Sequence, residues 1–552
     1  MPHRDEVVHG HDVRAARDAA GMVEGMTEMN QNGSTGGPER RELARFLEAQ
    51  VTRRRFLQGT AGVAAGPLAA RAMTTAAGFA AMTPRAVGAA QRALRQTGGD
   101  SAAAAVAAAK ALDPKPEKLT IVWEEALQSE DPTKFSGPMW EDLTGIKIET
   151  VSKPFTDLFS TQVTEHLGAT GAYDVLTMVP AWTADFVTQG LAEPLEPFID
   201  QYMNKADLDD YHPLYRSLMN YGGKIYGLFD DGDTIILYYR RDLFEDPANK
   251  DAFKEQYGHE LAAPTDWKQY DEIQAFFTEH GAGKTWGGAS QRAPGQVYGW
   301  FSEEFRNRGG RFFDEPSLNA TLDEQAGVDT LTRMVASNKT MPPGVETWGF
   351  VEVLSAWMAG QLAMIGGTWP PIGRWSEGTT AEQLAWVPKT AVAGKVGYSV
   401  MPMGHSLQNS GFSLAVSADS KQKEAAYLFI QWLTSPTISL QRVMLPYALR
   451  DPYRLSHYSS KEYRARWASA GAYLDTLKAA ADGALLDIIL PGSSEYHTAL
   501  DQMVTSAQSG TDVAEALKDG NAAFDQITDR VGRDKQKAAY AEFLKLRGSY
   551  YS

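Results

Sequence analysis

The chain contains no cysteine among its 552 residues, which excludes disulfides, thiolate metal sites, cysteine nucleophiles and a lipid-modified N-terminal cysteine. It also lacks a long, strongly apolar run. The Ala- and Gly-rich stretch 58–70 is poor in Leu, Ile and Phe and is broken by Pro67 and Arg71, so it falls short of the roughly 20 apolar residues that span a bilayer.

Positive charge is scarce as well. The net charge is −16, and the residues beyond 112 carry 39 basic against 59 acidic side chains. Because phosphate binding needs a basic face, we expect no nucleic-acid partner. The charge suits a neutral or cationic partner, although solubility alone also explains it.

Motifs of catalysis and metal binding are incomplete. Gly283-Lys284-Thr285 resembles the end of a phosphate-binding loop, but the glycine that the motif needs at position 278 is Thr. The 10 histidines do not pair at metal-ligand spacing, and no G-x-S-x-G turn occurs. We therefore expect no catalytic residue, no metal and no cofactor. A catalytic carboxylate pair stays open, because such carboxylates need not be neighbours in the chain.

The first 112 residues are predicted to be an export signal and a spacer. Residues 52–58 (TRRRFLQ) match the twin-arginine pattern, and no acidic residue occurs between Glu48 and Asp100. Ala70-Arg71-Ala72 fits a cleavage site, and the expected location is the periplasm. The long segment before the arginines is either a real extension or a sign of a later start codon. Residues 86–112 are Ala-rich and are expected to be a spacer that is in part helical, and not a folded domain.

Beyond residue 112 the hydrophobic pattern alternates between strand and helix. Strands are expected at 119–123, 146–151 and 173–179, with helices at 132–143 and 155–167 between them. Such units form a mixed or parallel sheet with helices on its faces, and ligands bind beyond the carboxyl ends of its strands. Later helices are expected at 267–280, 325–337, 350–359, 421–433 and 498–507.

Residues 223–244 (GKIYGLFDDGDTIILYYRRDLF) place three carboxylates around one glycine, just before an apolar run. This segment resembles the first crossover between the lobes of bacterial extracellular solute-binding proteins of the carbohydrate, maltose-binding-protein-like type. Other segments resemble the same family in the same order over about residues 117–530: 143–148, 172–175, 189–194, 358–369, 411–416, 420–433 and 509–518.

The resemblance implies an α/β fold of two lobes with a hinge and a ligand cleft between them. Lobe one would comprise residues 113–236 and 412–455, and lobe two residues 237–408 and 456–552. It also implies a monomer that captures a sugar or polyol and delivers it to the transmembrane subunits of an ABC permease.

Several residues are predicted to bind this ligand. Carboxylates accept hydrogen bonds from sugar hydroxyls, and aromatic rings cover apolar C–H faces. Asp233 and Trp369 match the acidic and stacking positions of the family. Asp230 and Asp231 either assist or cap the turn around Gly232. The further candidates are Trp182, Glu124 or Glu125, Tyr298, His497 and Arg454. For Arg454 the alternative is a salt bridge at the hinge.

Two other functions are compatible with the sequence. The acidic cluster and the acidic body also suit a polyamine or another cationic solute in the same fold. A secreted carbohydrate-active enzyme is the alternative from a different class, and it would need two facing carboxylates at hydrolase separation.

Overall fold

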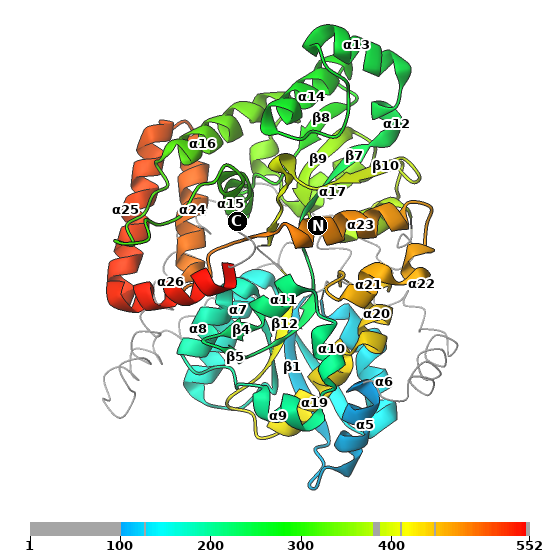
Figure 1. The fold of residues 1–552 in the computed structure, drawn as a ribbon, viewed down its shortest axis with the longest axis vertical. Coiled ribbons are helices and arrows are strands. Elements are labelled where there is room, and N and C mark those ends of the chain that lie inside the picture. The colour runs from blue at the N-terminus through cyan, green and yellow to red at the C-terminus, as the bar shows by residue number, and fades with distance from the viewer. Residues whose placement is uncertain (1–100, 126–127, 379–386, 409–410, 446–448, 548–552) are drawn as a thin grey trace, which may run out of the picture. The chain divides into compact units, whose positions relative to one another are not determined.

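The computed structural model describes residues 101–547, apart from 126–127, 379–386, 409–410 and 446–448. Two separate sheets, each flanked by helices, organise this part of the chain (Figure 1). We call the helices and strands around them lobe one and lobe two. The twin-arginine pattern and the expected cleavage site lie outside the described residues.

The sheet of lobe one has the strand order β2-β1-β3-β12-β6. Its strands are β1 (Lys118–Glu124), β2 (Lys147–Lys153), β3 (Val175–Met178), β6 (Leu228–Asp231) and β12 (Phe412–Val416). β1 is parallel to β2 and β3, whereas β12 is antiparallel to β3 and β6. β3, β6 and β12 are buried along their whole length, as expected for strands that are covered on both faces.

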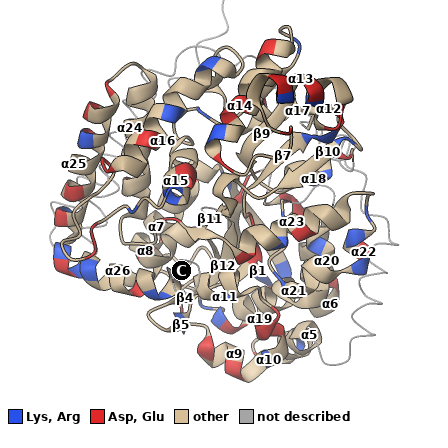
Figure 2. Ribbon diagram, turned by 45° about the horizontal axis from the view of Figure 1, so that its top comes forward, with Lys and Arg blue, Asp and Glu red and all other residues tan. Residues whose placement is uncertain are grey.

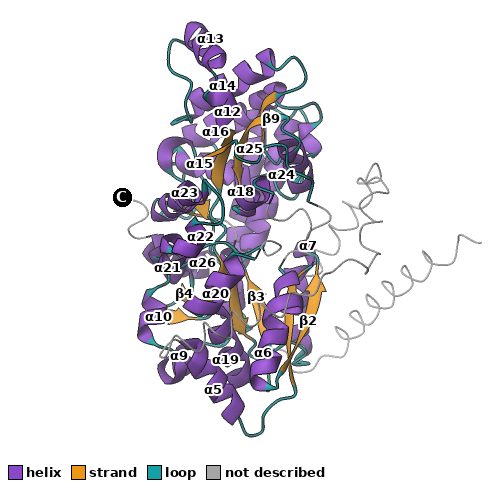
Figure 3. Ribbon diagram, turned by 90° about the vertical axis from the view of Figure 1, so that its right-hand side faces the viewer, coloured by secondary structure: helices purple, strands orange, loops and turns teal. Residues whose placement is uncertain are grey.

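Helices cover both faces of this sheet (Figure 3). They are α5 (Ser101–Ala111), α6 (Gly137–Thr144), α7 (Phe155–Gly168), α8 (Thr183–Thr188), α9 (Glu196–Tyr202), α10 (Lys205–Asp209), α11 (Pro213–Leu218), α19 (Lys423–Thr434) and α20 (Pro436–Val443). Trp140 of α6 packs against Phe429 and Trp432 of α19, with ring centroids 5.4 and 5.3 Å away. These large rings fix α19 to the lobe-one core.

The Ala-rich segment before residue 112 differs from the expected spacer. Residues 101–111 form helix α5, whose Ala102, Ala105 and Ala109 are fully buried. The Ser101 amide donates to Asp207 Oδ2 at 2.7 Å, and Gln431 Nε2 donates to the Ser101 carbonyl at 2.9 Å. Alanine lets two helix backbones approach closely, so this low-complexity sequence is a packed helix of lobe one.

The sheet of lobe two has the order β10-β7-β9-β8. Its strands are β7 (Ile236–Arg240), β8 (Trp286–Ala289), β9 (Leu362–Thr368) and β10 (Val396–Ser399). β7 is antiparallel to β9 and β10, and β8 is parallel to β9.

The helices of lobe two surround this sheet and extend to the C-terminal part of the chain. They are α12 (Arg241–Phe244), α13 (Pro247–Tyr257), α14 (Trp267–His280), α15 (Tyr298–Asn307), α16 (Gln325–Ser337), α17 (Phe350–Met358), α18 (Pro371–Ser376), α23 (Ala470–Asp482), α24 (Ser493–Gln508), α25 (Val513–Val531) and α26 (Arg533–Arg547). The short helices α21 (Leu455–Ser459) and α22 (Lys461–Arg464) precede α23, and the short strands β4 (Asn220–Tyr221) and β5 (Lys224–Ile225) pair with each other, as do β11 (Leu407–Gln408) and β13 (Leu485–Leu486).

The outer helices carry both signs of charge, for example α13 and α25 (Figure 2). Within the described residues, no helix is both long and apolar enough to span a membrane.

Candidate ligand-binding site at the crossover

The first connection between the two sheets runs from β6 to β7 through residues 232–235. Gly232 is required here because its backbone approaches another connection: a Cβ atom on it would lie 2.2 Å from the Pro452 carbonyl oxygen. The Gly232 amide donates to the Asp451 carbonyl at 3.1 Å. The glycine in the acidic stretch therefore lets two crossing segments touch.

Asp233 follows with φ of 46°, in the left-handed region that Asp tolerates better than most residues. Its side chain is half-buried, and its Oδ2 accepts a hydrogen bond from the Gly411 amide at 3.2 Å. Gly411 opens the second connection between the sheets, at the start of β12. Strained conformations of this kind persist where the surroundings hold them, and they cluster at binding sites.

Asp231, Asp233 and Asp451 bring carboxylate oxygens within 4.8 Å of one another. Asp231 accepts hydrogen bonds from Gln128 Nε2 and from the Asp451 amide, both at 2.7 Å. Burial and the neighbouring Asp451 raise the pKa of Asp231 well above its usual value. Burial raises the pKa of Asp451 to about 6, against the opposing effect of Arg374.

The Asp231–Asp451 pair therefore favours a shared proton, which relieves the repulsion between these two carboxyl groups. Three such oxygens are also a ligand set for a divalent cation. A guanidinium group stands beside Asp451, since Arg374 Nη1 lies 2.9 Å from its Oδ1. This neighbouring positive charge opposes the binding of a divalent cation at Asp451.

Asp230 is placed differently from its neighbours. Its carboxylate is fully buried and forms ion pairs with Arg442 and, at 2.7 Å, with Arg450. Burial alone would raise the pKa of Asp230, but the two guanidinium groups hold it below its usual value. The structure corrects the expectation that Asp230 contacts ligand, because both oxygens are engaged inside the protein.

Arg374 connects the acidic cluster to lobe two. It belongs to α18, which begins two residues after Trp369, and it is buried. Its Nη1 donates to Asp451 Oδ1 at 2.9 Å, to the Arg450 carbonyl at 3.0 Å and to the Tyr463 hydroxyl at 3.1 Å. The carboxyl group of Asp451 is thus held by a residue from the other lobe.

Trp369 follows β9 and is half-buried. Its ring packs on Phe350 and edge-on against Trp300, with centroids 5.4 and 5.9 Å away. The Tyr238 hydroxyl donates to the Trp369 carbonyl at 3.2 Å. The tryptophan is therefore fixed by aromatic neighbours while part of its surface stays accessible.

Trp182 lies at the end of a short helical turn after β3 and is only 6% exposed. Its ring lies between Phe155, at 5.6 Å, and Phe186, at 6.2 Å. Phe155 is 41% exposed and covers Trp182. The predicted residue Trp182 is thus the buried ring of this stack, and Phe155, which the sequence prediction did not select, is the exposed one.

Tyr298 and His497 come together in lobe two from α15 and α24. Their rings stack with centroids 4.5 Å apart and an angle of 18°. His497 Nε2 lies 3.0 Å from Asp487 Oδ2, and burial followed by the charge of Asp487 raises the pKa of Tyr298. Glu125 is exposed. Burial raises the pKa of its neighbour Glu124 to about 7.

Arg454 lies inside lobe one with no exposed surface. Its guanidinium group donates to the Asp207 carbonyl at 2.6 Å, pairs with Asp210 at 3.4 Å and lies 3.8 Å from the centre of the Tyr211 ring. The prediction that Arg454 contacts ligand is corrected in favour of its alternative, a structural ion pair.

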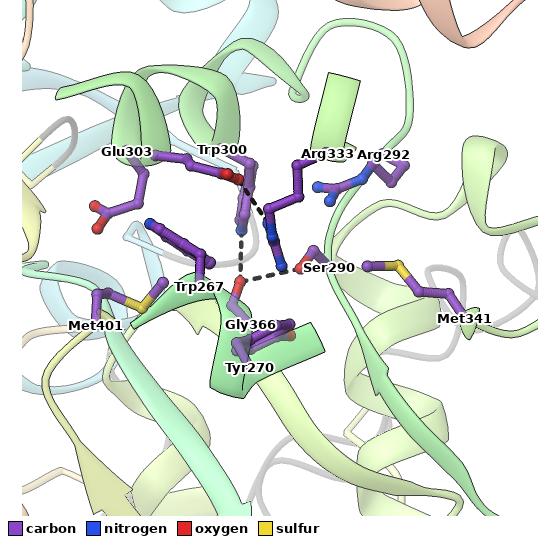
Figure 4. A pocket seen from close by; sticks show the side chains of 11 residues that line it. Trp267, Tyr270, Ser290, Arg292, Trp300, Glu303, Arg333, Met341, Gly366 and Met401 are labelled. Atoms are coloured by element: carbon purple, nitrogen blue, oxygen red, sulfur yellow. Dashed lines mark hydrogen bonds and ion pairs between the residues drawn. The ribbon is translucent and has the colours of Figure 1, made fainter. Parts of the chain in front are cut away.

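A separate small cavity of about 10 Å³ lies in lobe two, with room for about one water molecule (Figure 4). Trp267 and Arg333 line it, and the guanidinium carbon lies 4.4 Å from the ring centre. Arg333 also pairs with Asp271 at 2.7 Å and with Glu304 at 2.6 Å. Arg333 is thus paired within lobe two, and Arg292, Glu303 and Glu304 also line this cavity.

Solved structures show which fold the chain has. The chain resembles an ABC transporter solute-binding protein of Agrobacterium radiobacter K84 in complex with ribitol, with 21% identity, a TM-score of 0.62, and coverage of 75% of this chain and 100% of that one. A solute-binding protein of Agrobacterium vitis S4 with bound D-mannitol gives 23% identity, a TM-score of 0.61, and coverage of 75% and 99%. Maltose-bound MalE3 of T. maritima gives 22% identity, a TM-score of 0.60, and coverage of 74% of this chain and 99% of that one. The fold is thus the α/β, two-lobed fold of periplasmic binding proteins.

The chain belongs to the bacterial extracellular solute-binding protein family, which it matches over residues 122–438. Proteins of this family bind solutes and are not enzymes, so the enzyme alternative is not supported.

Related curated proteins agree with the family. One is a probable amino-acid ABC transporter periplasmic-binding protein of Sinorhizobium fredii, 28% identical over 307 residues, or 54% of this chain and 64% of that protein. Another is the mannitol-binding protein of Pseudomonas aeruginosa, which is 26% identical over 280 residues, or 48% of this chain and 57% of that protein. The chain therefore spans less than two thirds of the length of these curated relatives.

Proposed function

We propose that this protein is the periplasmic substrate-binding component of an ABC importer. It captures a sugar or polyol between its two lobes and delivers it, as a monomer, to the transmembrane subunits of the permease. Export by the twin-arginine route follows from residues 52–58. The named ligands of structural neighbours, which are ribitol, mannitol and maltose, support this class of solute.

The observation that carries the proposal is the conformation of Asp233. A half-buried carboxylate held at φ of 46° stands where the chain passes from one sheet to the other. A carboxylate there accepts strong hydrogen bonds from paired hydroxyl groups, and the accessible part of Trp369 covers an apolar face of the same ligand.

The other predicted residues take separate parts. Glu125, Tyr298 and His497 remain predicted contacts. Asp231 shapes the acidic cluster, and Trp182 lies behind Phe155.

A thermal unfolding screen of the full-length protein tests this proposal. The panel holds glucose, maltose, mannitol, ribitol, putrescine and spermidine. A ligand at 100 times its dissociation constant stabilises the folded state by about 2.7 kcal/mol, which appears as a higher midpoint. We expect stabilisation by at least one carbohydrate or polyol. Stabilisation by none of the four would contradict the proposal.

A second candidate is a cationic solute. It is favoured by the oxygens of Asp231, Asp233 and Asp451, which lie within 4.8 Å of one another, and by the acidic body. An ammonium group would replace the shared proton of this cluster. Stabilisation by putrescine or spermidine alone would establish this alternative and retain the fold.

A further inference from the structure

Phe155 is an exposed aromatic side chain on a protein that buries most of its rings. Among the described residues, four large apolar side chains are exposed, and Phe155, at 41%, is the aromatic one. It is not on a loop tip. It follows Pro154 directly and begins helix α7, so its backbone is fixed by a helix start.

The inner face of Phe155 rests on a stack of rings. Phe155 and Trp182 are nearly parallel, with a centroid distance of 5.6 Å and an angle of 25°. Trp182 and Phe186 continue the stack at 6.2 Å and 12°. Phe159 packs on Trp182 from the side at 5.4 Å, and Phe412 meets Phe155 edge-on at 6.3 Å. The ring of Phe155 is thus packed against other aromatic rings, while 41% of the residue stays exposed.

The sheet places Phe155 at the same end of its strands as the acidic cluster. Phe155 follows the carboxyl end of β2, and Trp182 follows the carboxyl end of the parallel strand β3. β12 runs the opposite way, so its first residue, Phe412, lies at the same edge, where it pairs with Asp231 at the end of β6. Ligands of open α/β sheets bind beyond this edge.

We propose that Phe155 is the lobe-one aromatic that packs on the apolar C–H face of the ligand, and that Trp182 is its support. This inference rests on the proposed function. A ring that is already rigid loses little conformational entropy when it binds, and it loses unfavourable exposure to water. Phe155 thereby complements Trp369, which supplies an aromatic surface from lobe two.

The test compares Phe155→Ala, Phe155→Leu and Phe155→Trp in the full-length protein by calorimetric titration with glucose, maltose, mannitol and ribitol. For each ligand that binds the wild type, we expect Phe155→Ala to raise the dissociation constant about tenfold. Phe155→Leu keeps apolar area without a flat face, so its dissociation constant should lie between those of the wild type and Phe155→Ala. The dissociation constant of Phe155→Trp should be close to that of the wild type. Met403→Ala, which truncates another exposed apolar side chain, is the matched control and should change nothing.

The midpoint of unfolding without ligand separates contact from support. It should fall more in Trp182→Ala than in Phe155→Ala, because Trp182 is only 6% exposed whereas Phe155 is 41% exposed. A wild type that binds, together with an unchanged dissociation constant in Phe155→Ala, would overturn this inference alone. A wild type that binds none of the four ligands would overturn the proposed function and this inference with it.

Discussion

Asp230 and Asp233 lie only three residues apart in the sequence, but their carboxylates have different surroundings. Asp230 is the last but one residue of β6 and points into the core of lobe one, where two arginines neutralise it. Asp233 lies beyond the strand, half-buried and in the left-handed region. The first carboxylate is neutralised inside lobe one, and the second is the one that we propose contacts the ligand.

Substitution by asparagine should separate these two roles. Asp233→Asn keeps the size of the side chain and suits a left-handed backbone, but it removes the charge of the acceptor. Hydrogen bonds to charged groups contribute about 1.5–3 kcal/mol, so carbohydrate affinity should fall roughly 10- to 150-fold. The unfolding midpoint without ligand should change little.

Asp230→Asn should lower the stability of the protein and leave its carbohydrate affinity unchanged. Removing one partner of a buried ion pair costs about 3–5 kcal/mol, because the arginines are left uncompensated. Urea denaturation should report this loss, while the folded fraction should bind carbohydrate with unchanged affinity. Equal stability of Asp230→Asn and the wild type would contradict the structural role.

At the scale of elements, helix α5 illustrates packing that composition concealed. Ala105 faces α19 with no exposed surface, whereas Ala107 of the same helix is exposed. Ala105→Glu would bury a charge without a partner and should destabilise lobe one by about 3 kcal/mol or more. Ala107→Glu adds the same side chain to the outer face and should leave thermal unfolding within about 0.5 kcal/mol of the wild type. Similar midpoints for the two variants would show that α5 is not packed.

Helices α8 and α24 meet through one carboxyl group. The Gly492 amide, at the start of α24, donates to Asp185 Oδ1 at 3.0 Å. Burial raises the pKa of Asp185 to about 7, although this hydrogen bond opposes the shift. Because the folded state holds this proton more tightly than the unfolded state does, its contribution to stability is fully present below about pH 4 and is lost as the pH rises through about 7.

Asp185→Asn should therefore flatten the pH dependence of unfolding. The amide still accepts from Gly492 but does not ionise, so the variant should gain on the order of 3 kcal/mol relative to the wild type at pH 8 compared with pH 4. Urea denaturation at a series of pH values measures this difference. Parallel profiles for the two proteins would contradict the assigned protonation.

Much of the architecture follows from local patterns in the sequence. Helices 267–280 and 325–337 are found where their hydrophobic period predicts them. The strand predicted at 119–123 is longer in the structure by one residue at each end. The packing of helix α5 in lobe one was not predicted, because alanine gives no strong amphipathic pattern and its burial depends on α19, more than 300 residues later.

The site was predictable only where a residue carries its own signal. Asp233 and Trp369 were selected because the segments around them resemble the family, and they remain predicted contacts. The roles of Asp451, Arg374 and Phe155 arise from contacts between distant segments, such as the pairing of Arg374 with Asp451. Arg454 shows the converse: a polar residue near a hinge suggested binding, while tertiary packing buried it.

At the scale of the whole molecule, the crossing segments link the two sheets through polar contacts. Thr234 Oγ1 donates to Gln408 Oε1 at 2.5 Å, and Arg374 of lobe two holds Asp451. A ligand that binds Asp233 and Trp369 together touches both lobes, so binding energy favours the closed arrangement. Small-angle X-ray scattering should therefore record a smaller radius of gyration with a saturating carbohydrate than without it, and no change in Asp233→Asn at the same concentration.

The most direct test of the central claim is calorimetric titration of the full-length protein with glucose, maltose, mannitol and ribitol, repeated with Asp233→Asn. The account predicts one site per chain for at least one of these ligands, and a loss of affinity of tenfold or more in the variant. Binding that is absent for all four, or that is unchanged in Asp233→Asn, would contradict it.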